Sequence, residues 1–345
     1  MLCWLTEDRL QVGLRMLGAV LTAFLIASVG GKWIIAWLRQ KRLGERTDKT
    51  PIEDEKLRAQ INTKSGTPTM GGLLMMAGLL PACLLWGRLN DSYLWMAIGC
   101  FLALAALGMV DDLRKLTGKS HRDRGLKVRY KLLAQGAIGC ALGALVLLSP
   151  DLQANRLFAL EGLIPLGGLA VLWFALVIAT MSNAVNVTDG LDGLAGGLTL
   201  VALVPLGVLA MSGPHGELAV FAGALFGGVV GFLWHNWHPA RVFMGDTGSL
   251  ALGGSIGLLA LLNRAELLLP LIALVALVEF GSSVLQVLWF KATGRRILPI
   301  APIHHLFQQK GWPETHIVAR FCLVALVVML GTCFIVIRQA GFLPA

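Results

Sequence analysis

Residues 193–214 read GLAGGLTLVALVPLGVLAMSGP, a run of 22 residues without one charged side chain. An α-helix rises about 1.5 Å per residue, so about 20 apolar residues cross the hydrocarbon core of a bilayer. The run is long enough for this. It therefore predicts a helix that spans a membrane.

Comparable runs lie on both sides of this segment. Charge-free stretches occur at 65–87, 92–110, 132–150 and 162–188, and weaker ones at 16–38, 218–234, 247–263, 267–290 and 318–337. Together they predict an all-α integral membrane protein with about ten transmembrane helices. The composition agrees, because 56% apolar and 14% charged residues are not the balance of a soluble globular domain.

Lysine and arginine are concentrated in alternate connecting segments. If the helices alternate in direction, one set of segments lies at 39–69, 111–131, 183–193, 235–247 and 291–317 and carries most of the basic residues. The positive-inside rule places this set in the cytoplasm and both termini in the periplasm. The net charge of +9 follows the same asymmetry, so it indicates orientation in a membrane rather than binding of nucleic acid. No segment is long enough for a separate soluble domain, and we expect residues 1–345 to form a single polytopic domain.

Carboxylates and amides gather on the predicted cytoplasmic side. Asp111 and Asp112 end the third span, and Lys115 follows on the same helical face as Asp111. A second group recurs at every third position and comprises Asn183, Asn186, Asp189 and Asp192. A charged helix end explains the first group in ordinary structural terms, and turn chemistry explains the second. The unbroken spacing of the second group favours a function.

Three further segments belong to the same face. Asp246 lies just before the eighth span and follows Phe243, an aromatic residue in a turn. An N-cap accounts for Asp246 but leaves Phe243 without a role. His304 and His305 follow two prolines and precede a basic stretch, and the Gly- and hydroxyl-rich segment 64–72 begins with Lys64.

These residue types predict the chemistry of the site. A carboxylate drawn to membrane depth costs about 2.5–3.5 kcal/mol unless it is compensated. Oxygen ligands select a hard cation such as Mg²⁺, which binds one or two carboxylates together with substrate phosphates. The six scattered cysteines have no zinc or disulfide spacing. The residues therefore predict Mg²⁺-dependent phosphoryl transfer that involves a nucleotide or diphosphate, with lysines neutralising the diphosphate.

Five motifs in order make the chain resemble the phospho-N-acetylmuramoyl-pentapeptide transferases over nearly its whole length. They are residues 66–72, Asp111-Asp112 with Lys115, residues 183–195, residues 242–250, and residues 301–305 followed by 310–314. The resemblance implies a ten-helix enzyme, usually a homodimer, in the bacterial cytoplasmic (inner) membrane. Such an enzyme uses Mg²⁺ to move a phospho-sugar-peptide from a UDP carrier to undecaprenyl phosphate. The products are UMP and lipid I, the first lipid-linked precursor of peptidoglycan.

The resemblance also implies roles for particular residues. Asp246 would be the principal Mg²⁺ ligand and Asn186 a second, while Asp111 and Asp112 would face the phosphates. Lys115 and Lys127 join Lys64 as candidates to neutralise the diphosphate, and Asn183 belongs to the same polar face. The positions that match the nucleotide pocket are Lys64, Thr69, Asp189, Asp192, Phe243 and Gln286. His304 and His305 match a histidine motif near the sugar-peptide.

One departure from the family pattern bears on substrate choice. The family commonly has three consecutive histidines and then an acid, whereas Leu306 and Gln308 stand at those positions here. A sister transferase that loads N-acetylglucosamine phosphate on the same lipid is therefore an alternative. A multi-span transporter is a second alternative, but it would place its polar groups near the bilayer midplane. Glu279 is an intramembrane carboxylate that shares a helix face with Gln286. Two explanations stand for it, a functional role and a hydrogen bond between packed helices.

Overall fold

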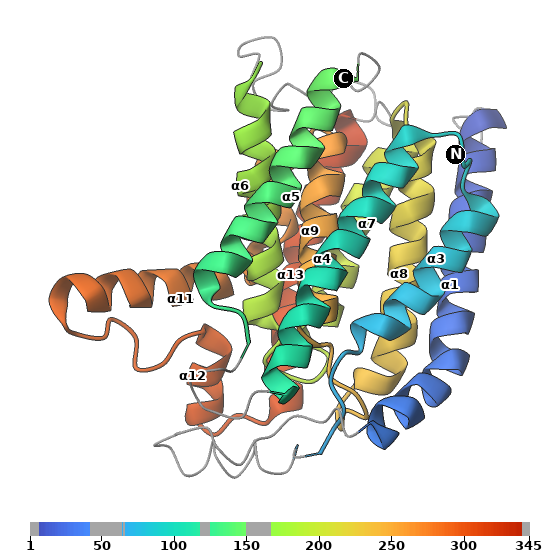
Figure 1. The fold of residues 1–345 in the computed structure, drawn as a ribbon. Coiled ribbons are helices and arrows are strands. Elements are labelled where there is room, and N and C mark those ends of the chain that lie inside the picture. Colours follow the sequence, from blue (N-terminus) through green and yellow to red (C-terminus); the bar gives the residue numbers. More distant parts are fainter. Residues whose placement is uncertain (1–6, 42–63, 65, 118–124, 150–166, 340–345) are drawn as a thin grey trace.

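The structure is a computed structural model that describes residues 7–41, 64, 66–117, 125–149 and 167–339 (Figure 1). Within the expected cytoplasmic segments, residues 42–63, 65 and 118–124 lie outside the described residues, as do both extreme ends of the chain. The described residues form helices joined by turns and short connections. In chain order, the helices are α1 Glu7–Gln40, α3 Gly72–Trp86, α4 Ser92–Thr117, α5 Val128–Leu148, α6 Leu169–Thr188, α7 Leu194–Ser212, α8 Gly216–Asn236, α9 Gly245–Leu262, η3 Glu266–Leu268, α10 Leu269–Ile272, α11 Leu274–Thr293, α12 Ile303–Gln309 and α13 Glu314–Gln339.

The expected integral membrane architecture is confirmed. Within the described ranges, nine helices are long and apolar enough to cross a bilayer. The sequence predicts about ten spans, and the remaining one corresponds to α3, an apolar helix of only 15 residues. Helix α3 begins late because residues 66–71 form turns around one bridge residue, Pro68, and Met70 has a left-handed φ of 71°.

Helix α9 forms the centre of the bundle, between α4, α6, α7 and α3. Every residue from Asp246 to Leu262 is buried, so this helix is surrounded by protein rather than lipid. Glycines let its neighbours approach closely. A Cβ atom on Gly108 of α4 would lie 2.1 Å from the carbonyl oxygen of Asp246, so only glycine permits this crossing. Because the contact is made by backbone, it fixes the distance between the end of α4 and the start of α9.

The span predicted as one helix over 267–290 is broken. Residues 266–268 form a 3₁₀ turn, Pro270 lies in the first turn of α10, and Ala273 leaves the helical region with φ −119° and ψ 30°. The chain then continues as α11, which leaves the bundle sideways (Figure 1). Four of its residues are buried, namely Val275, Ala276, Glu279 and Ser282. Proline in the first turn is compatible with the start of α10, and the non-helical backbone of Ala273 separates α10 from α11.

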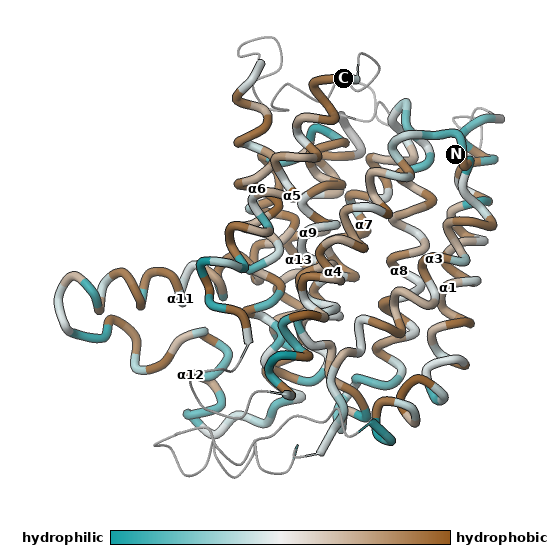
Figure 2. The backbone as a smooth tube through the Cα atoms, viewed as in Figure 1, coloured by the Kyte–Doolittle hydropathy of each residue, from teal (hydrophilic) through white to brown (hydrophobic). Residues whose placement is uncertain are grey.

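The ends of the bundle differ in polarity. The N- and C-terminal ends of the described chain lie on one side, and α12 lies on the other (Figure 1). Hydrophilic residues gather near α12 and the end of α4 (Figure 2). The connecting segments are shorter than expected, because α4 continues to Thr117, α6 to Thr188, and α13 begins at Glu314. Asp111, Asp112, Asn186 and Asp246 thus lie near helix ends, where backbone geometry fixes them. Lys64, Thr69, Asp192 and Phe243 lie in the connecting segments.

Candidate active site

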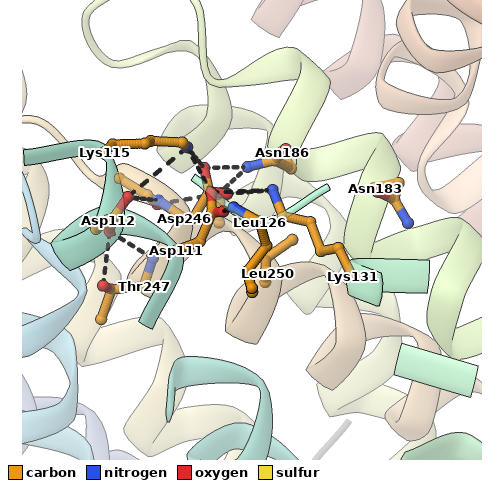
Figure 3. Close-up of polar contacts among 12 residues, drawn as sticks. Asp111, Asp112, Lys115, Leu126, Lys131, Asn183, Asn186, Asp246, Thr247 and Leu250 are labelled. Carbon is orange, nitrogen blue, oxygen red and sulfur yellow. Dashed lines mark hydrogen bonds and ion pairs between the residues drawn. The ribbon is translucent and has the colours of Figure 1, made fainter. Parts of the chain in front are cut away.

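Three aspartates converge at the polar end of the bundle. Asp111 and Asp112 lie in the last two turns of α4, and Asp246 is the second residue of α9. All three are buried, with at most 6% of each residue exposed. Figure 3 shows their side chains meeting those of lysine and asparagine residues from neighbouring helices. We name this group the aspartate centre, and its members are Asp111, Asp112, Asp246, Lys115, Lys131 and Asn186.

Asp112 caps the beginning of α9. Its Oδ1 accepts the backbone N–H of Asp246 at 3.0 Å, and its Oδ2 accepts the backbone N–H of Thr247 at 2.9 Å. The Thr247 hydroxyl donates to the same oxygen at 2.7 Å. A helix start has free N–H groups and a positive dipole end, so a carboxylate is well suited to this place. Asp112 therefore orients the helix turn that carries Asp246.

The chain reaches this cap through Gly245, whose φ of 69° lies in the left-handed region. A Cβ there would stand 2.6 Å from Asp112 Oδ2 and 2.7 Å from the Thr69 hydroxyl. Both backbone conformation and space therefore require glycine at this position. The predicted binding residue Thr69 thus lies beside the aspartate centre.

Two lysines neutralise the other two aspartates. Lys115 Nζ lies 2.8 Å from Asp111 Oδ2 and 2.8 Å from Asp246 Oδ1. Lys131 Nζ lies 3.4 Å from Asp111 Oδ2 and donates to Asp246 Oδ2. With all groups ionised, three carboxylates face two ammonium groups and leave one excess negative charge. This excess negative charge would attract a further cation to the aspartate centre.

Lys131 was not singled out by the sequence analysis, which named Lys127 instead. Lys127 is the exposed N-cap residue of α5, and no ion pair is recorded for it among the described residues. Lys131 lies one helical turn further along, where the side chain reaches the aspartates. The spacing could have indicated Lys131, because it lies four residues after Lys127 on the same helix face and further into the helix.

The two asparagines of α6 have different surroundings. Asn186 Nδ2 donates to Asp246 Oδ1 at 3.0 Å and to the Ser249 hydroxyl at 2.8 Å. Asn183 points away from the aspartates (Figure 3), and its Nδ2 donates to Gln135 Oε1 at 2.7 Å. The three-residue spacing thus brings Asn186 to the centre, whereas Asn183 joins α6 to α5.

A second ionic group surrounds Lys64. Its Nζ lies 2.7 Å from Asp192 Oδ1 and 2.6 Å from Glu314 Oε1. Asp192 also lies 3.1 Å from His238 Nδ1, and its backbone N–H donates to Glu314 Oε1. Burial alone would lower the pKa of Lys64, but Glu314 and Asp192 outweigh it and hold that pKa above its usual value. We name these four residues the Lys64 network.

Glu314 and His238 of this network were not among the predicted site residues. Glu314 begins α13 and joins the Lys64 segment to the turn between α6 and α7. In the sequence, Glu314 stands out only as part of the motif at residues 310–314. Lys64 and Glu314 are 250 positions apart, so no local sequence pattern predicts that they form an ion pair.

Short backbone pairing connects the two groups. Phe243 N–H donates to Pro68 O at 2.8 Å, and Gly71 N–H donates to Phe243 O at 2.7 Å. The half-buried Phe243 ring lies with its centroid 5.9 Å from Lys64 Nζ. The segment after Lys64 is thereby tied to the turn before Asp246. Asp189, the C-cap residue of α6, lies in the neighbouring turn.

The predicted histidines lie on α12. His304 is fully buried, and His305 Nδ1 lies 2.7 Å from Gln308 Oε1. Burial, and then the neighbouring His304, lower the pKa of His305 to about 4, so its ring is neutral at pH 7. Gln286 of α11 donates to Leu298 O and accepts the N–H of Leu298, both at 2.9 Å. Its amide therefore binds the segment that leads into α12.

Two groups have donors suited to a divalent cation. Among the described residues, ligand atoms of Asp192, His238 and Glu314 lie within 4.8 Å of one another. Lys64 already bridges two of these carboxylates, so a cation there would have to displace its ammonium group. The aspartate centre offers carboxylate oxygens from two helices and an excess negative charge, which fits Mg²⁺. Lys115 and Lys131 bridge Asp111 and Asp246 there, so their ammonium groups would likewise have to move aside for the ion. Asn186 presents its amide nitrogen to Asp246, so it would have to turn its amide over to ligate the same ion.

Comparisons with known proteins identify similar sequences. Residues 94–263 match the family described as glycosyl transferase family 4, and residues 64–74 match phospho-N-acetylmuramoyl-pentapeptide-transferase signature 1. The phospho-N-acetylmuramoyl-pentapeptide-transferase of Dinoroseobacter shibae is 40% identical over 333 residues, which cover 91% of this chain and 90% of that protein. The protein of the same name from Thermodesulfovibrio yellowstonii is 38% identical over 336 residues, which cover 92% and 91%.

The two alignments cover 91% and 92% of this chain. The resemblance inferred from the motifs is thus confirmed over nine-tenths of the chain. The chain belongs to the family of phospho-N-acetylmuramoyl-pentapeptide-transferases.

Proposed function

We propose that this protein transfers phospho-N-acetylmuramoyl-pentapeptide from its UDP carrier to undecaprenyl phosphate. The products are UMP and lipid I, the first lipid-linked precursor of peptidoglycan. The observation that carries the proposal is the convergence of Asp111, Asp112 and Asp246 with Lys115 and Lys131 at one end of a membrane bundle. Acids and lysines in such a group suit a diphosphate and its metal ion.

Mg²⁺ is the cofactor in this proposal, held by Asp246 and by Asn186 with its amide turned over. Bound there, the ion would supply a Lewis acid that stabilises the negative charge of the diphosphate. Lys115 and Lys131 each contact Asp246 and are long enough to turn toward phosphate oxygens. Asp112 holds the first turn of α9, so it acts by orienting Asp246.

Asp111 faces the acceptor phosphate in this proposal. A phosphate monoester has its second pKa near about 6, so the acceptor is largely dianionic at neutral pH and needs no strong base. We infer a single in-line displacement. An oxygen of undecaprenyl phosphate bonds to the phosphorus that carries the sugar, and the bond from that phosphorus to the bridging oxygen breaks. UMP leaves with the electron pair and the bridging oxygen.

A covalent route through Asp111 is the alternative mechanism, in which its carboxylate attacks the same phosphorus first. Incubation with the nucleotide donor alone distinguishes the two routes. Single displacement predicts no phospho-N-acetylmuramoyl-pentapeptide adduct on Asp111 by mass spectrometry and no UMP before undecaprenyl phosphate is added. Such an adduct on Asp111, formed together with UMP, would establish the covalent route.

The remaining predicted residues supply substrate contacts. Lys64, Phe243, Thr69, Asp189 and Asp192 would line the nucleotide pocket, with Phe243 stacking on uracil and Lys64 turning from Asp192 toward phosphate. Gln286 supports the adjacent segment through its backbone contacts. His304 and His305 would lie beside the sugar-peptide. Of the lysines, Lys131 replaces Lys127 as the candidate for the diphosphate, since it reaches the aspartates.

The same proposal includes the placement of the chain in the cell. The polar end faces the cytoplasm and both termini face the periplasm, in the cytoplasmic (inner) membrane of a bacterium. Support comes from the charge asymmetry of the connecting segments and from the two ends of the described chain, at α1 and α13, lying opposite α12 (Figure 1). Residues 1–345 form one polytopic domain, and two copies associate as a homodimer.

A donor competition tests the function. Purified protein receives Mg²⁺, undecaprenyl phosphate and either UDP-N-acetylmuramoyl-pentapeptide or UDP-N-acetylglucosamine, and release of UMP is measured. We expect release only with the muramoyl-peptide donor. Release only with the N-acetylglucosamine donor would instead support the sister transferase that Leu306 and Gln308 leave as an alternative.

Two variants of α9 control this assay. Asp246→Ala should nearly abolish release of UMP, because it removes the central carboxylate. Ser255→Ala changes a buried hydroxyl of the same helix that has no hydrogen-bond partner among the described residues, so it should leave the rate unchanged. Release by Asp246→Ala near that of the unmodified protein would remove Asp246 from the proposed mechanism.

A further inference from the structure

Glu279 is a buried acid that the proposed reaction does not use. It lies on α11, the helix that leaves the bundle, and only 1% of its surface is exposed. A carboxylate buried in a membrane helix is costly and needs hydrogen-bond donors. Among the described residues, the hydrogen bonds to its carboxylate all come from His304, which is fully buried. The backbone N–H of His304 lies 3.1 Å from Oε1, and Nδ1 of its ring lies 3.0 Å from Oε2.

This geometry fixes the orientation and the tautomer of the imidazole. A carboxylate oxygen has only lone pairs to offer, so the attraction requires that Nδ1 carry a hydrogen and donate it. The other ring nitrogen, Nε2, is buried and has no hydrogen-bond partner among the described residues. It faces the turn after α6, where a Cβ on Gly190 would lie 2.3 Å from it. The His304 ring is therefore held by Glu279 at Nδ1 and packs against the backbone of Gly190 at Nε2.

The same carboxylate also anchors the helix that carries the histidines. His304 is the second residue of α12, and the N-cap residue, Pro302, makes no side-chain cap. Glu279 supplies that cap from α11, by accepting the N–H of His304. Seven residues further along α11, Gln286 binds the backbone of Leu298. Two polar side chains of one helix thus fix the segment that returns from α11 to α12.

The position of α12 determines where the His305 side chain lies. His305 is adjacent to His304, with ring centroids 4.2 Å apart, and is hydrogen bonded to Gln308. Movement of His304 would displace both His305 and the Gly190 turn, which lies between Asp189 and Asp192. Both lie on the side of the site where the donor is expected to bind. Among the described residues, the aspartate centre makes no hydrogen bond or ion pair with Glu279 or His304, so it should be little affected.

We propose that Glu279 is a positioning residue for the donor substrate, acting through His304 to seat α12 against the Gly190 turn. The proposal rests on the proposed function, because it concerns binding of the same sugar-nucleotide. It predicts that loss of Glu279 weakens donor binding and leaves the chemical step and the lipid acceptor nearly unchanged.

Steady-state kinetics with both substrates test the proposal. Glu279→Ala should raise the KM for UDP-N-acetylmuramoyl-pentapeptide about tenfold, which corresponds to about 1.4 kcal/mol. Its kcat and its KM for undecaprenyl phosphate should change less than threefold. Glu279→Gln keeps one acceptor oxygen, so its donor KM should rise only about threefold. Ser283→Ala, on the same helix, removes a buried hydroxyl without a partner among the described residues and serves as the matched control.

A second variant reaches His304 from the opposite side. Gly190→Ala places a methyl group against Nε2 and leaves Glu279 intact, so it should raise the donor KM similarly. The two effects should not add, because both displace one ring: Glu279→Ala with Gly190→Ala should resemble either single variant. Gly190→Ala also remains informative if Glu279→Ala does not fold.

The outcomes separate the two levels of the proposal. An unmodified protein that releases no UMP from either donor would contradict the proposed function. Activity of the unmodified protein, with a Glu279→Ala donor KM within twofold of it, would overturn the positioning role. A fall in kcat with an unchanged donor KM would overturn it equally, because a merely structural residue reduces the number of active molecules. Additive effects of the two variants would show that Gly190 and Glu279 do not act through the same ring.

Discussion

Replacement of Asp112 should reduce stability as well as turnover, because this residue caps α9 from α4. Asp112→Ala removes the acceptor of two backbone N–H groups and one hydroxyl, all of them buried. Loss of an N-cap costs about 0.5–2 kcal/mol, and each buried donor left without a partner costs about 1–3 kcal/mol. Removing one of three neighbouring carboxylates relieves repulsion and offsets part of this cost. We therefore expect the free energy of unfolding to fall by about 2–4 kcal/mol.

The assay is unfolding from mixed micelles by titration with a denaturing detergent, followed by tryptophan fluorescence. Thr247→Val removes only the hydroxyl donor and should cost about 1 kcal/mol. In the Asp112→Ala background the same change should cost less than about 0.5 kcal/mol, since its acceptor is already gone. An unchanged free energy of unfolding in Asp112→Ala, or the full cost of Thr247→Val in both backgrounds, would refute the capping role.

Three further predictions follow from the site. Lys131→Met should lower UMP release at least about 100-fold, since Lys131 contacts two aspartates, whereas Lys127→Met should lower it less than about threefold; equal effects in the UMP assay would contradict this difference. Glu314→Gln should lower the pKa of Lys64 toward its usual value. Binding of the nucleotide donor, measured by calorimetry across the alkaline range, should then weaken at a lower pH than in the unmodified protein. An unshifted pH profile of binding would argue against the pairing of Glu314 with Lys64. Because the folded-state pKa of His305 is about 4, below the ordinary 6.5, its contribution to stability is present above pH 6.5 and is lost as the pH falls toward 4. His305→Gln should remove that part of the acid dependence of the unfolding temperature, and an identical dependence in both proteins would contradict it.

The membrane architecture and the aspartates could be predicted because each rests on a local pattern. Charge-free runs define spans by length alone, and Asp111, Asp112 and Asp246 stand at span ends in the sequence. Once the spans alternate, all three residues fall on one side, so their convergence follows from topology. The break at Ala273 was missed because hydropathy continues across it, although the backbone leaves the helical region there with φ −119° and ψ 30°.

The partners of the polar residues could not be predicted in the same way. Lys64 pairs with Glu314, and Glu279 pairs with His304, through contacts that join distant parts of the chain. Such pairs depend on which helix faces meet, and hydropathy carries little information about helix rotation within a bundle. The regular spacing from Asn183 to Asp192 was a good indication of a polar surface. It did not reveal that successive members bind different partners.

The backbone contact between Gly108 and Asp246 has a consequence for variation in this protein. A methyl group at position 108 would push α4 and α9 apart while every acid, amide and lysine stayed in the sequence. A genome survey that checked only the reactive side chains would then score an inactive protein as intact. Gly108 should therefore be checked together with the charged residues when natural or laboratory variants are classified as active or inactive.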